Sequence, residues 1–151
     1  MPGQSRRAGF MLIDVAMALA VVLLVAAVMW PAMPRATNSA RLSATAMEIA
    51  TVLRADRTSA RRTGNPSATV LDLSSRTVSG GGRSLAVAPG FAFEVLTTAA
   101  CRQAGNRFRI EFRPDGSSCG AVVRIAAGGR AFRVRVNWLT GWVDVVGPEK
   151  A

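Results

Sequence analysis

A run of 21 residues, 10–30, that is apolar except for Asp14 constrains this chain more than any other feature of its sequence. As an α-helix rising about 1.5 Å per residue, this run would be roughly 31 Å long, which matches the roughly 30 Å hydrocarbon core of a bilayer. We therefore expect residues 10–33 to form a helix that spans a membrane.

Two export signals would also place basic residues before an apolar run. A secretory signal peptide would use Arg6 and Arg7 as its positive region and the small residues near 32–36 as its cleavage zone, but its apolar part usually has only about 7 to 15 residues. A twin-arginine signal would begin at Ser5, although no globular cargo is needed to explain these residues. Neither signal explains Asp14, so we favour a retained helix.

The carboxylate of Asp14 needs a cationic partner. On insertion scales it would cost roughly 2.5–3.5 kcal/mol at the centre of a membrane, and less near the interface. Cleavage between Gly9 and Phe10 would create such a cation, because the new amino terminus of Phe10 would lie one helical turn from Asp14. In a bundle of identically oriented helices, that amine could instead reach the Asp14 of a neighbouring chain.

The stretch GFMLIDV, residues 9–15, resembles the processing site of type IV prepilins and type II secretion pseudopilins. The resemblance implies that residues 1–9 are a leader, that a prepilin peptidase cuts after Gly9, and that the exposed amine of Phe10 is methylated. It also implies that Asp14, where the family usually has Glu, forms the charge pair used in assembly. Pro31 matches the position at which many members kink the long helix; a helix stop just outside the membrane is the alternative.

Composition excludes several classes of site. The 151 residues suit one modest domain with an accessory segment, and 19 basic against 9 acidic residues give a formal charge of +10, which suits acidic proteins, phosphates or lipid headgroups. Histidine is absent, which removes imidazole-dependent triads and zinc sites. Cys101 and Cys119 have no companion ligands nearby in the sequence. We expect no enzyme activity, no metal and no cofactor.

A second helix is predicted after the apolar run. Residues 35–62 contain neither proline nor glycine, and four apolar residues recur at steps of four, three and four, which is the spacing of one helical face: Leu42, Ala46, Ile49 and Leu53. The stop signals Thr63, Gly64, Asn65 and Pro66 follow. We assign residues 34–63 to an amphipathic stalk helix.

The remainder, 64–151, predicts a β-rich domain. Short alternating segments read as strands at 69–73, 84–87, 91–96, 107–112, 121–126, 131–136 and 142–146. Tight turns are expected at 114–116, at Gly128 and Gly129, and at 137–141. An antiparallel sheet packed on the stalk helix would bury both apolar faces, so the predicted fold class is α+β.

The sequences of two predicted loops partly resemble ligand-binding motifs. The run 79–84, SGGGRS, lacks the following helix and the lysine spacing of a P-loop, so we interpret it as a flexible connection between strands. Asp115 with Ser117 and Ser118 falls far short of the roughly six to eight oxygens that calcium requires. Neither loop predicts a ligand.

The carboxy-terminal half carries a second resemblance. Residues 109–120, RIEFRPDGSSCG, and 132–143, FRVRVNWLTGWV, resemble the GspH/FimT family of minor pseudopilins and minor pilins. The resemblance implies a type IV pilin-like fold and a subunit held in the inner membrane by a single pass, with its carboxy-terminal domain in the periplasm. The implied partners are the prepilin peptidase, the other minor pseudopilins, the major pseudopilin and inner-membrane lipid.

On this basis we predict an H-type minor pseudopilin of a type II secretion system, assembled near the tip of the pseudopilus to support protein secretion across the outer membrane. The alternative is a minor type IV pilin of the FimT kind that binds DNA for uptake, which would share every amino-terminal feature. A hydrolase would require a catalytic constellation that the sequence lacks.

The periplasmic location implied by the resemblance bears on the cysteines. An oxidising compartment could join Cys101 to Cys119. We favour this disulfide over two separate buried thiols.

A basic interaction face is also predicted. Because side chains alternate along a strand, Arg107, Arg109 and Arg113 share one side of their strand, and Arg133 and Arg135 repeat the pattern on another. If the two strands are neighbours, they form one arginine-rich face. This face could be simply solvated, could dock onto acidic subunits, or could bind DNA; few aromatic residues interleave with the arginines to stack bases, so DNA is not favoured.

Overall fold

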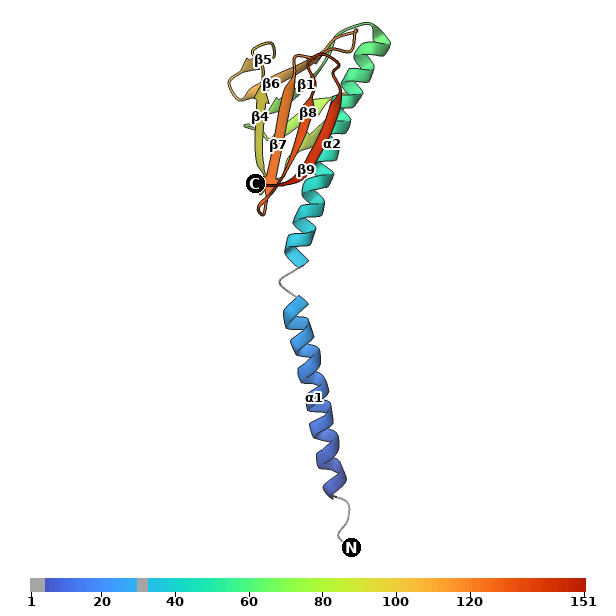
Figure 1. Ribbon diagram of the computed structural model, residues 1–151, viewed down its shortest axis with the longest axis vertical. Helices are drawn as coiled ribbons and strands as arrows, with labels where there is room; N and C mark the ends of the chain where they lie inside the picture. Colours follow the sequence, from blue (N-terminus) through green and yellow to red (C-terminus); the bar gives the residue numbers. More distant parts are fainter. Residues whose placement is uncertain (1–4, 30–32) are drawn as a thin grey trace. The chain divides into compact units, whose positions relative to one another are not determined.

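The computed structural model describes residues 5–29 and 33–151, with side chains described at 13–27 and 38–151. The chain divides into two compact units, Met1–Thr37 and Asn38–Ala151. Helix α1 (Ser5–Met29) belongs to the first unit, and helix α2 (Met33–Thr63) supplies the second unit with its residues from Asn38 onward (Figure 1). Pro31, the predicted kink, lies outside the described residues, as does the side chain of Phe10.

Helix α1 exposes apolar side chains over its described length. From Ile13 to Leu24 the large apolar residues are more than half exposed, and Leu24 reaches 70%. Within the described parts of the chain, no helix combines the length and the apolarity that crossing a membrane requires.

Helix α2 forms as the apolar periodicity predicts. The stripe Leu42, Ala46, Ile49 and Leu53 is completely buried. The helix ends at Thr63, and Gly64, which follows it, adopts a φ of 68° and donates its amide hydrogen to the carbonyl of Ala60 at 3.1 Å. A residue in the left-handed region satisfies the last carbonyls of a helix, and glycine adopts that conformation without a Cβ penalty.

The β-rich part contains two antiparallel sheets, where the sequence predicted one. The five-stranded sheet has the order β3-β2-β1-β6-β5, and the four-stranded sheet has the order β4-β7-β8-β9. The strands are β1 (Ser67–Asp72), β2 (Thr77–Gly80), β3 (Arg83–Ala86), β4 (Ala92–Thr97), β5 (Arg102–Ala104), β6 (Arg107–Phe112), β7 (Ala121–Ala127), β8 (Arg130–Val136) and β9 (Val143–Lys150). Strands β2 and β5 were not predicted. In the four-stranded sheet, β7 with β8 and β8 with β9 form hairpins, and β4 pairs with β7 after a longer connection. In the five-stranded sheet, β1 pairs with β6, which comes much later in the chain.

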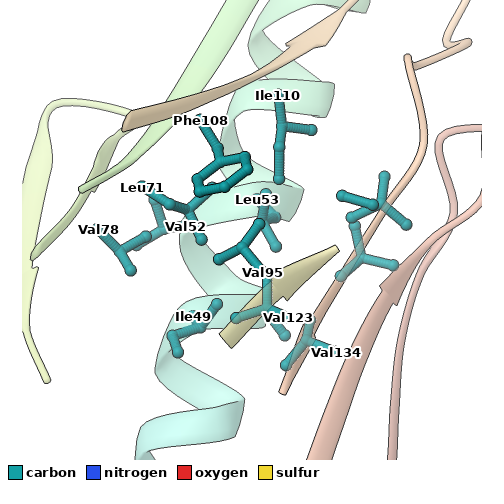
Figure 2. Close-up of a cluster of buried hydrophobic side chains, with 14 of the residues drawn as sticks. Ile49, Val52, Leu53, Leu71, Val78, Val95, Phe108, Ile110, Val123 and Val134 are labelled. Atoms are coloured by element: carbon teal, nitrogen blue, oxygen red, sulfur yellow. The ribbon is translucent and has the colours of Figure 1, made fainter. Parts of the chain in front are cut away.

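One hydrophobic core joins α2 to both sheets. Figure 2 shows Ile49, Val52 and Leu53 of α2 among side chains of the five-stranded sheet and of the four-stranded sheet. The sheet residues labelled there are Leu71, Val78, Phe108 and Ile110 from the first sheet, and Val95, Val123 and Val134 from the second. Burying apolar area stabilises a protein by about 25 cal/mol per Å² removed from water, so this shared core is the main stabilising contribution to the unit.

The three predicted turns are present. Gly128 and Gly129 both have positive φ, 58° and 75°, as a tight two-residue hairpin with right-handed strand twist requires. The amide of Gly116 donates to the carbonyl of Arg113 at 2.9 Å, and the amide of Gly141 donates to the carbonyl of Asn137 at 2.8 Å.

The glycine run at 79–84 forms the turn between β2 and β3, and this turn is packed against α2 instead of being a flexible connection. A Cβ on Gly80 would lie 2.1 Å from Oδ2 of Asp56, and one on Gly81 would lie 2.9 Å from the Cβ of Ala55. Both glycines are therefore needed for the close approach of the hairpin to the helix.

Candidate interaction surfaces

The residues of the predicted processing site lie within α1. The helical backbone runs continuously through Gly9 and Phe10, and Asp14 follows one turn later with its side chain exposed. Among the described side chains of α1, residues 13–27, Asp14 carries the one charge. Over residues 13–27 the helix therefore presents a single carboxylate on an otherwise apolar surface, where a cation could pair with it.

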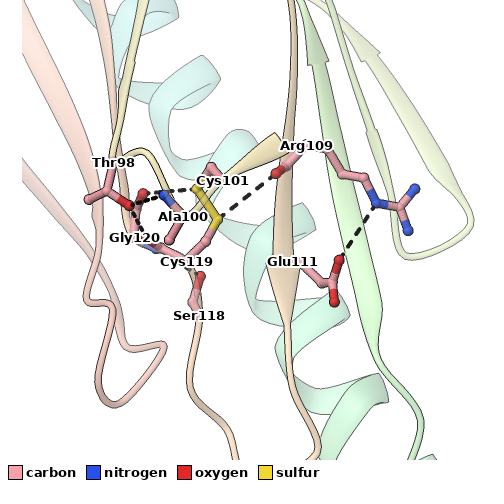
Figure 3. The surroundings of a disulfide bond; sticks show 8 residues. All are labelled: Thr98, Ala100, Cys101, Arg109, Glu111, Ser118, Cys119 and Gly120. Atoms are coloured by element: carbon pink, nitrogen blue, oxygen red, sulfur yellow. Dashed lines mark hydrogen bonds and ion pairs between the residues drawn. A yellow bond between two sulfur atoms is a disulfide. The ribbon is translucent and has the colours of Figure 1, made fainter. Parts of the chain in front are cut away.

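A disulfide joins Cys101 to Cys119, with 5.1 Å between their Cα atoms (Figure 3). Each cysteine lies where the chain passes from one sheet to the other: Cys101 follows β4 and immediately precedes β5, and Cys119 lies between β6 and β7. The Oγ1 of Thr98 donates to the carbonyl of Cys119 at 2.7 Å. The bond therefore fastens together the two crossings between the sheets.

A buried carboxylate, Asp56, was not predicted. Its side chain is only 3% exposed and accepts hydrogen bonds from Oγ of Ser67 at 2.7 Å, from Oγ1 of Thr69 at 2.6 Å and from the amide of Gly81 at 2.9 Å. The three donors come from β1, the central strand of the five-stranded sheet, and from the β2–β3 turn, so Asp56 fixes both of these segments to α2. Asp56 lies three residues after Leu53, on the same helical face as the apolar stripe, and this spacing in the sequence could have indicated that its side chain is buried.

The five arginines of the predicted basic face lie on two different sheets, which corrects that prediction. Arg107 and Arg109 are on β6 of the five-stranded sheet, with Arg113 just beyond it, whereas Arg133 and Arg135 are on β8 of the four-stranded sheet. The neighbours of β6 are β1 and β5, so no single arginine-rich surface forms.

Carboxylates from neighbouring strands neutralise the arginines of the four-stranded sheet. Ion pairs join Arg133 to Glu149 of β9, Arg135 to Asp144 of β9 at 3.0 Å, and Arg124 of β7 to Glu94 of β4 at 3.0 Å. Exposed pairs of this kind contribute only about 0–1 kcal/mol each. Three arginines of this sheet, Arg124, Arg133 and Arg135, are therefore each paired with a carboxylate, and this face carries mixed charge.

The outer face of the five-stranded sheet is a better candidate for binding an anion. It forms an open hollow of about 840 Å³, whose lining includes Ser75, Thr77, Ser79, Arg102, Arg107 and Arg109. Arg102 stands directly opposite Arg109 on the adjacent strand. Like charges in this arrangement destabilise a sheet unless an anion lies between them.

The other arginine in the hollow is held by a carboxylate. Arg107 donates to Oδ2 of Asp72 at 2.8 Å, while Arg109 approaches Glu111 only to 3.9 Å. The backbone hydrogen bond from Ser75, together with the side-chain hydrogen bond from Arg107, lowers the pKa of Asp72. Arg102 and Arg109 are thus the cations that remain available to a phosphate or carboxylate.

A third surface, absent from the sequence-based predictions, consists of the exposed side chains Trp138, Leu139 and Trp142. These residues are 63%, 63% and 64% exposed, although the loop that carries them is well ordered by hydrogen bonds. Large exposed apolar groups that lie together mark interaction sites.

The loop around Asp115 forms a turn. Oδ1 of Asp115 accepts hydrogen bonds from the hydroxyl and the amide of Ser117, and these bonds lower the pKa of Asp115. Over the residues that the structure describes, no three side chains of the metal-binding types gather into a cluster.

Comparison with known proteins identifies the fold. No family model matches the sequence, and no curated protein matches it. Among solved structures, the type IV minor pilin FimU of Pseudomonas aeruginosa is similar, with a TM-score of 0.55 and 13% sequence identity over 76% of this chain and 95% of that chain. The α+β, type IV pilin-like fold is thereby confirmed, with helix α2 packed on antiparallel sheet.

Proposed function

We propose that this chain is a non-enzymatic minor subunit of a type IV pilin-like filament. The observation that carries the proposal is the union of a pilin-like domain with an amino-terminal helix whose apolar side chains are exposed and which bears one carboxylate, Asp14. Such a helix needs other apolar groups around it, and a filament of identically oriented helices provides them.

In this proposal the chain begins as a single-pass protein of the inner membrane, with residues 10–33 in the bilayer and the domain in the periplasm. Prepilin peptidase removes residues 1–9, and the new amine of Phe10 is methylated. That amine then pairs with an Asp14 in the growing filament, since an unpaired carboxylate among apolar helices is costly. Pro31 would kink the helix where it leaves the filament core.

The filament that we favour is the pseudopilus of a type II secretion system, in which this chain would be the H-type minor pseudopilin near the tip. The resemblance of residues 109–120 and 132–143 to the GspH/FimT family supports this choice. A minor pilin of a type IV pilus is the second candidate, and the structural similarity to the minor pilin FimU favours it. Such a pilin could bind DNA, for which the hollow beside Arg102 and Arg109 offers cations.

Processing can be tested by intact-mass analysis of the chain purified from membranes. We expect a mature chain that begins with methylated Phe10. A chain that retains Met1, or one that begins near Thr37 after removal of a signal peptide, would contradict the proposal.

Assembly can be tested with variants of Asp14. Asp14→Ala should be cleaved normally, because the residue lies after the cut, yet it should enter sheared filaments at least about tenfold less. Asp14→Glu keeps the charge and is the matched control, so it should assemble like the unchanged chain. Equal assembly of the alanine variant would show that this carboxylate has no part in filament formation.

The two filament systems can be separated by phenotype and by DNA binding. Deleting the gene should abolish protein secretion in the favoured case, and should abolish DNA uptake or pilus function in the alternative. We expect only weak, nonspecific DNA binding at physiological salt, falling by about 0.9 logarithmic units per neutralised phosphate for each tenfold rise in salt. Tight binding that Arg102→Glu with Arg109→Glu abolishes would favour the DNA-binding pilin; Arg133→Glu with Arg135→Glu is the control on the neutralised sheet.

A further inference from the structure

The exposed tryptophans lie at one defined end of the domain. We name residues 113–118 and 137–142 the distal loops. Their backbones are in contact, because a Cβ on Gly141 would lie 2.2 Å from the carbonyl oxygen of Gly116. Arg57 and Arg61, in the last turns of α2, lie against these loops.

The opposite end of the domain is where the chain enters it. There Arg130, at the hairpin between β7 and β8, donates to Oγ of Ser39 at 2.8 Å. Figure 1 shows this hairpin and the β8–β9 connection at opposite ends of the four-stranded sheet. The distal loops therefore lie at the end of the domain that is away from residue 38.

The tryptophans are held on a rigid support. Oδ1 of Asn137 accepts hydrogen bonds from the amides of Leu139 at 2.9 Å and Thr140 at 3.0 Å. The amide of Ser118 donates to the carbonyl of Trp138, and Arg57 donates to the carbonyl of Thr140 at 3.0 Å. These bonds hold the backbone of the loop, so binding a partner through this surface would require little ordering of the main chain.

Trp142 stands between two hollows. One, of about 190 Å³, is lined by Arg54, Arg57 and Thr58 of α2 together with the tryptophan. The other, of about 530 Å³, lies on the outer face of the four-stranded sheet beside Val122 and Arg135. Tryptophan and arginine are enriched among the residues that carry most of the binding energy of protein interfaces.

The charge around the distal loops indicates the chemistry of the partner. Four arginines lie at this end of the domain and have no carboxylate within 4.0 Å among the described residues: Arg57, Arg61, Arg62 and Arg113. The acidic residue of the distal loops, Asp115, accepts hydrogen bonds from the amide and the hydroxyl of Ser117. A complementary surface would present apolar side chains bordered by carboxylates.

We propose that Trp138, Leu139 and Trp142, with the arginines around them, form the surface that binds the globular domain of the next subunit along the filament. The inference rests on the proposed function: a head-to-tail assembly of identically oriented subunits is held by heterologous contacts, in which one end of each domain binds a different surface of the next subunit. Together the two indole rings can bury on the order of 300 Å², a substantial part of the roughly 800 Å² that one partner contributes to a standard interface.

Photo-cross-linking in intact cells tests the surface. The full chain carries p-benzoylphenylalanine at position 138 or 142, or at Met47 as the matched control, because Met47 is an apolar residue of α2 that is 60% exposed outside the surface. Mass spectrometry of the adducts should identify a pilin-like subunit joined at positions 138 and 142. Adducts with lipid or with proteins unrelated to pilins, and a pilin-like adduct confined to position 47, would each overturn the inference.

Substitutions give an independent readout. Trp138→Ala with Trp142→Ala should reduce recovery of the chain in sheared filaments at least about tenfold, while Met47→Ala leaves it unchanged; oxidised Cys101 and Cys119 report that each variant has folded. Normal recovery of the tryptophan variant, without cross-linking at position 138, would reject this surface and leave the proposed function standing. Absence of the unchanged chain from filaments would overturn both.

Discussion

Replacing Asp56 by alanine should destabilise the unit Asn38–Ala151 by about 2–4 kcal/mol. The hydroxyl of Thr69 is completely buried, so losing its acceptor costs about 1–3 kcal/mol. Ser67 is partly exposed and Gly81 is exposed, so water replaces much of what these two donors lose, and we assign them about 1 kcal/mol together.

Urea unfolding of residues 38–151, followed by far-ultraviolet circular dichroism, measures this effect on the unit that contains the whole buried core. At a slope of about 2 kcal/mol per molar urea, the middle of the usual range of about 1–3, the midpoint should fall by roughly 1–2 M. Asp115→Ala is the control, because it removes an exposed aspartate that also accepts hydrogen bonds from a serine.

Asp56→Asn distinguishes hydrogen bonding from charge. The amide oxygen can accept from Ser67 and Gly81, and the amide nitrogen can donate to the hydroxyl of Thr69, which also accepts. We therefore expect the asparagine variant to lose less than half of what the alanine variant loses. An alanine variant within about 0.5 kcal/mol of the unchanged protein, or an asparagine variant as unstable as alanine, would refute the reasoning.

Two further predictions concern stability. Alkylation of the unreduced, denatured domain should label neither Cys101 nor Cys119, and reduction should destabilise it by about 3 kcal/mol on chain-entropy estimates; labelling of both without reductant would exclude the bond. Asp72→Asn should be less stable than the unchanged domain at neutral pH. Because the folded-state pKa of Asp72 lies below its ordinary value of 3.8, this difference should persist as the pH falls to about 4 and close at lower pH. A difference that widens below pH 4 in urea titrations would reverse the assigned direction.

Local features of this fold could be predicted from the sequence. The buried stripe of α2 follows from the spacing of Leu42, Ala46, Ile49 and Leu53, and the hairpin at Gly128 and Gly129 follows from the need for positive φ. The short strands β2 and β5 could not be predicted, because their four and three residues are held by neighbouring strands and have no strong pattern of their own.

The division into two sheets depends on pairing between distant residues. Ser67 of β1 pairs with Phe112 of β6, and local alternation in the sequence carries no information about such a partner. The error in the predicted basic face has this cause, because Arg109 and Arg133 show the same local pattern on strands of different sheets. The surface around Trp142 could not be predicted either, since an exposed tryptophan in a turn and a buried one look alike in a sequence.

The position of the disulfide also determines how this domain would respond to mechanical load. If a filament is pulled, tension that enters through α2 and leaves through β9 crosses directly from Cys101 to Cys119. The residues between them, including the whole of β5 and β6, are excluded from the stretched path while the bond is intact. The cysteines are separated by 18 positions in the sequence. At about 3.3–3.6 Å per residue, the intact disulfide therefore prevents roughly 60 Å of chain from being extended. An oxidised subunit would therefore lengthen less than a reduced one before it comes apart, and single-molecule extension would show the difference as a missing increment of about that size.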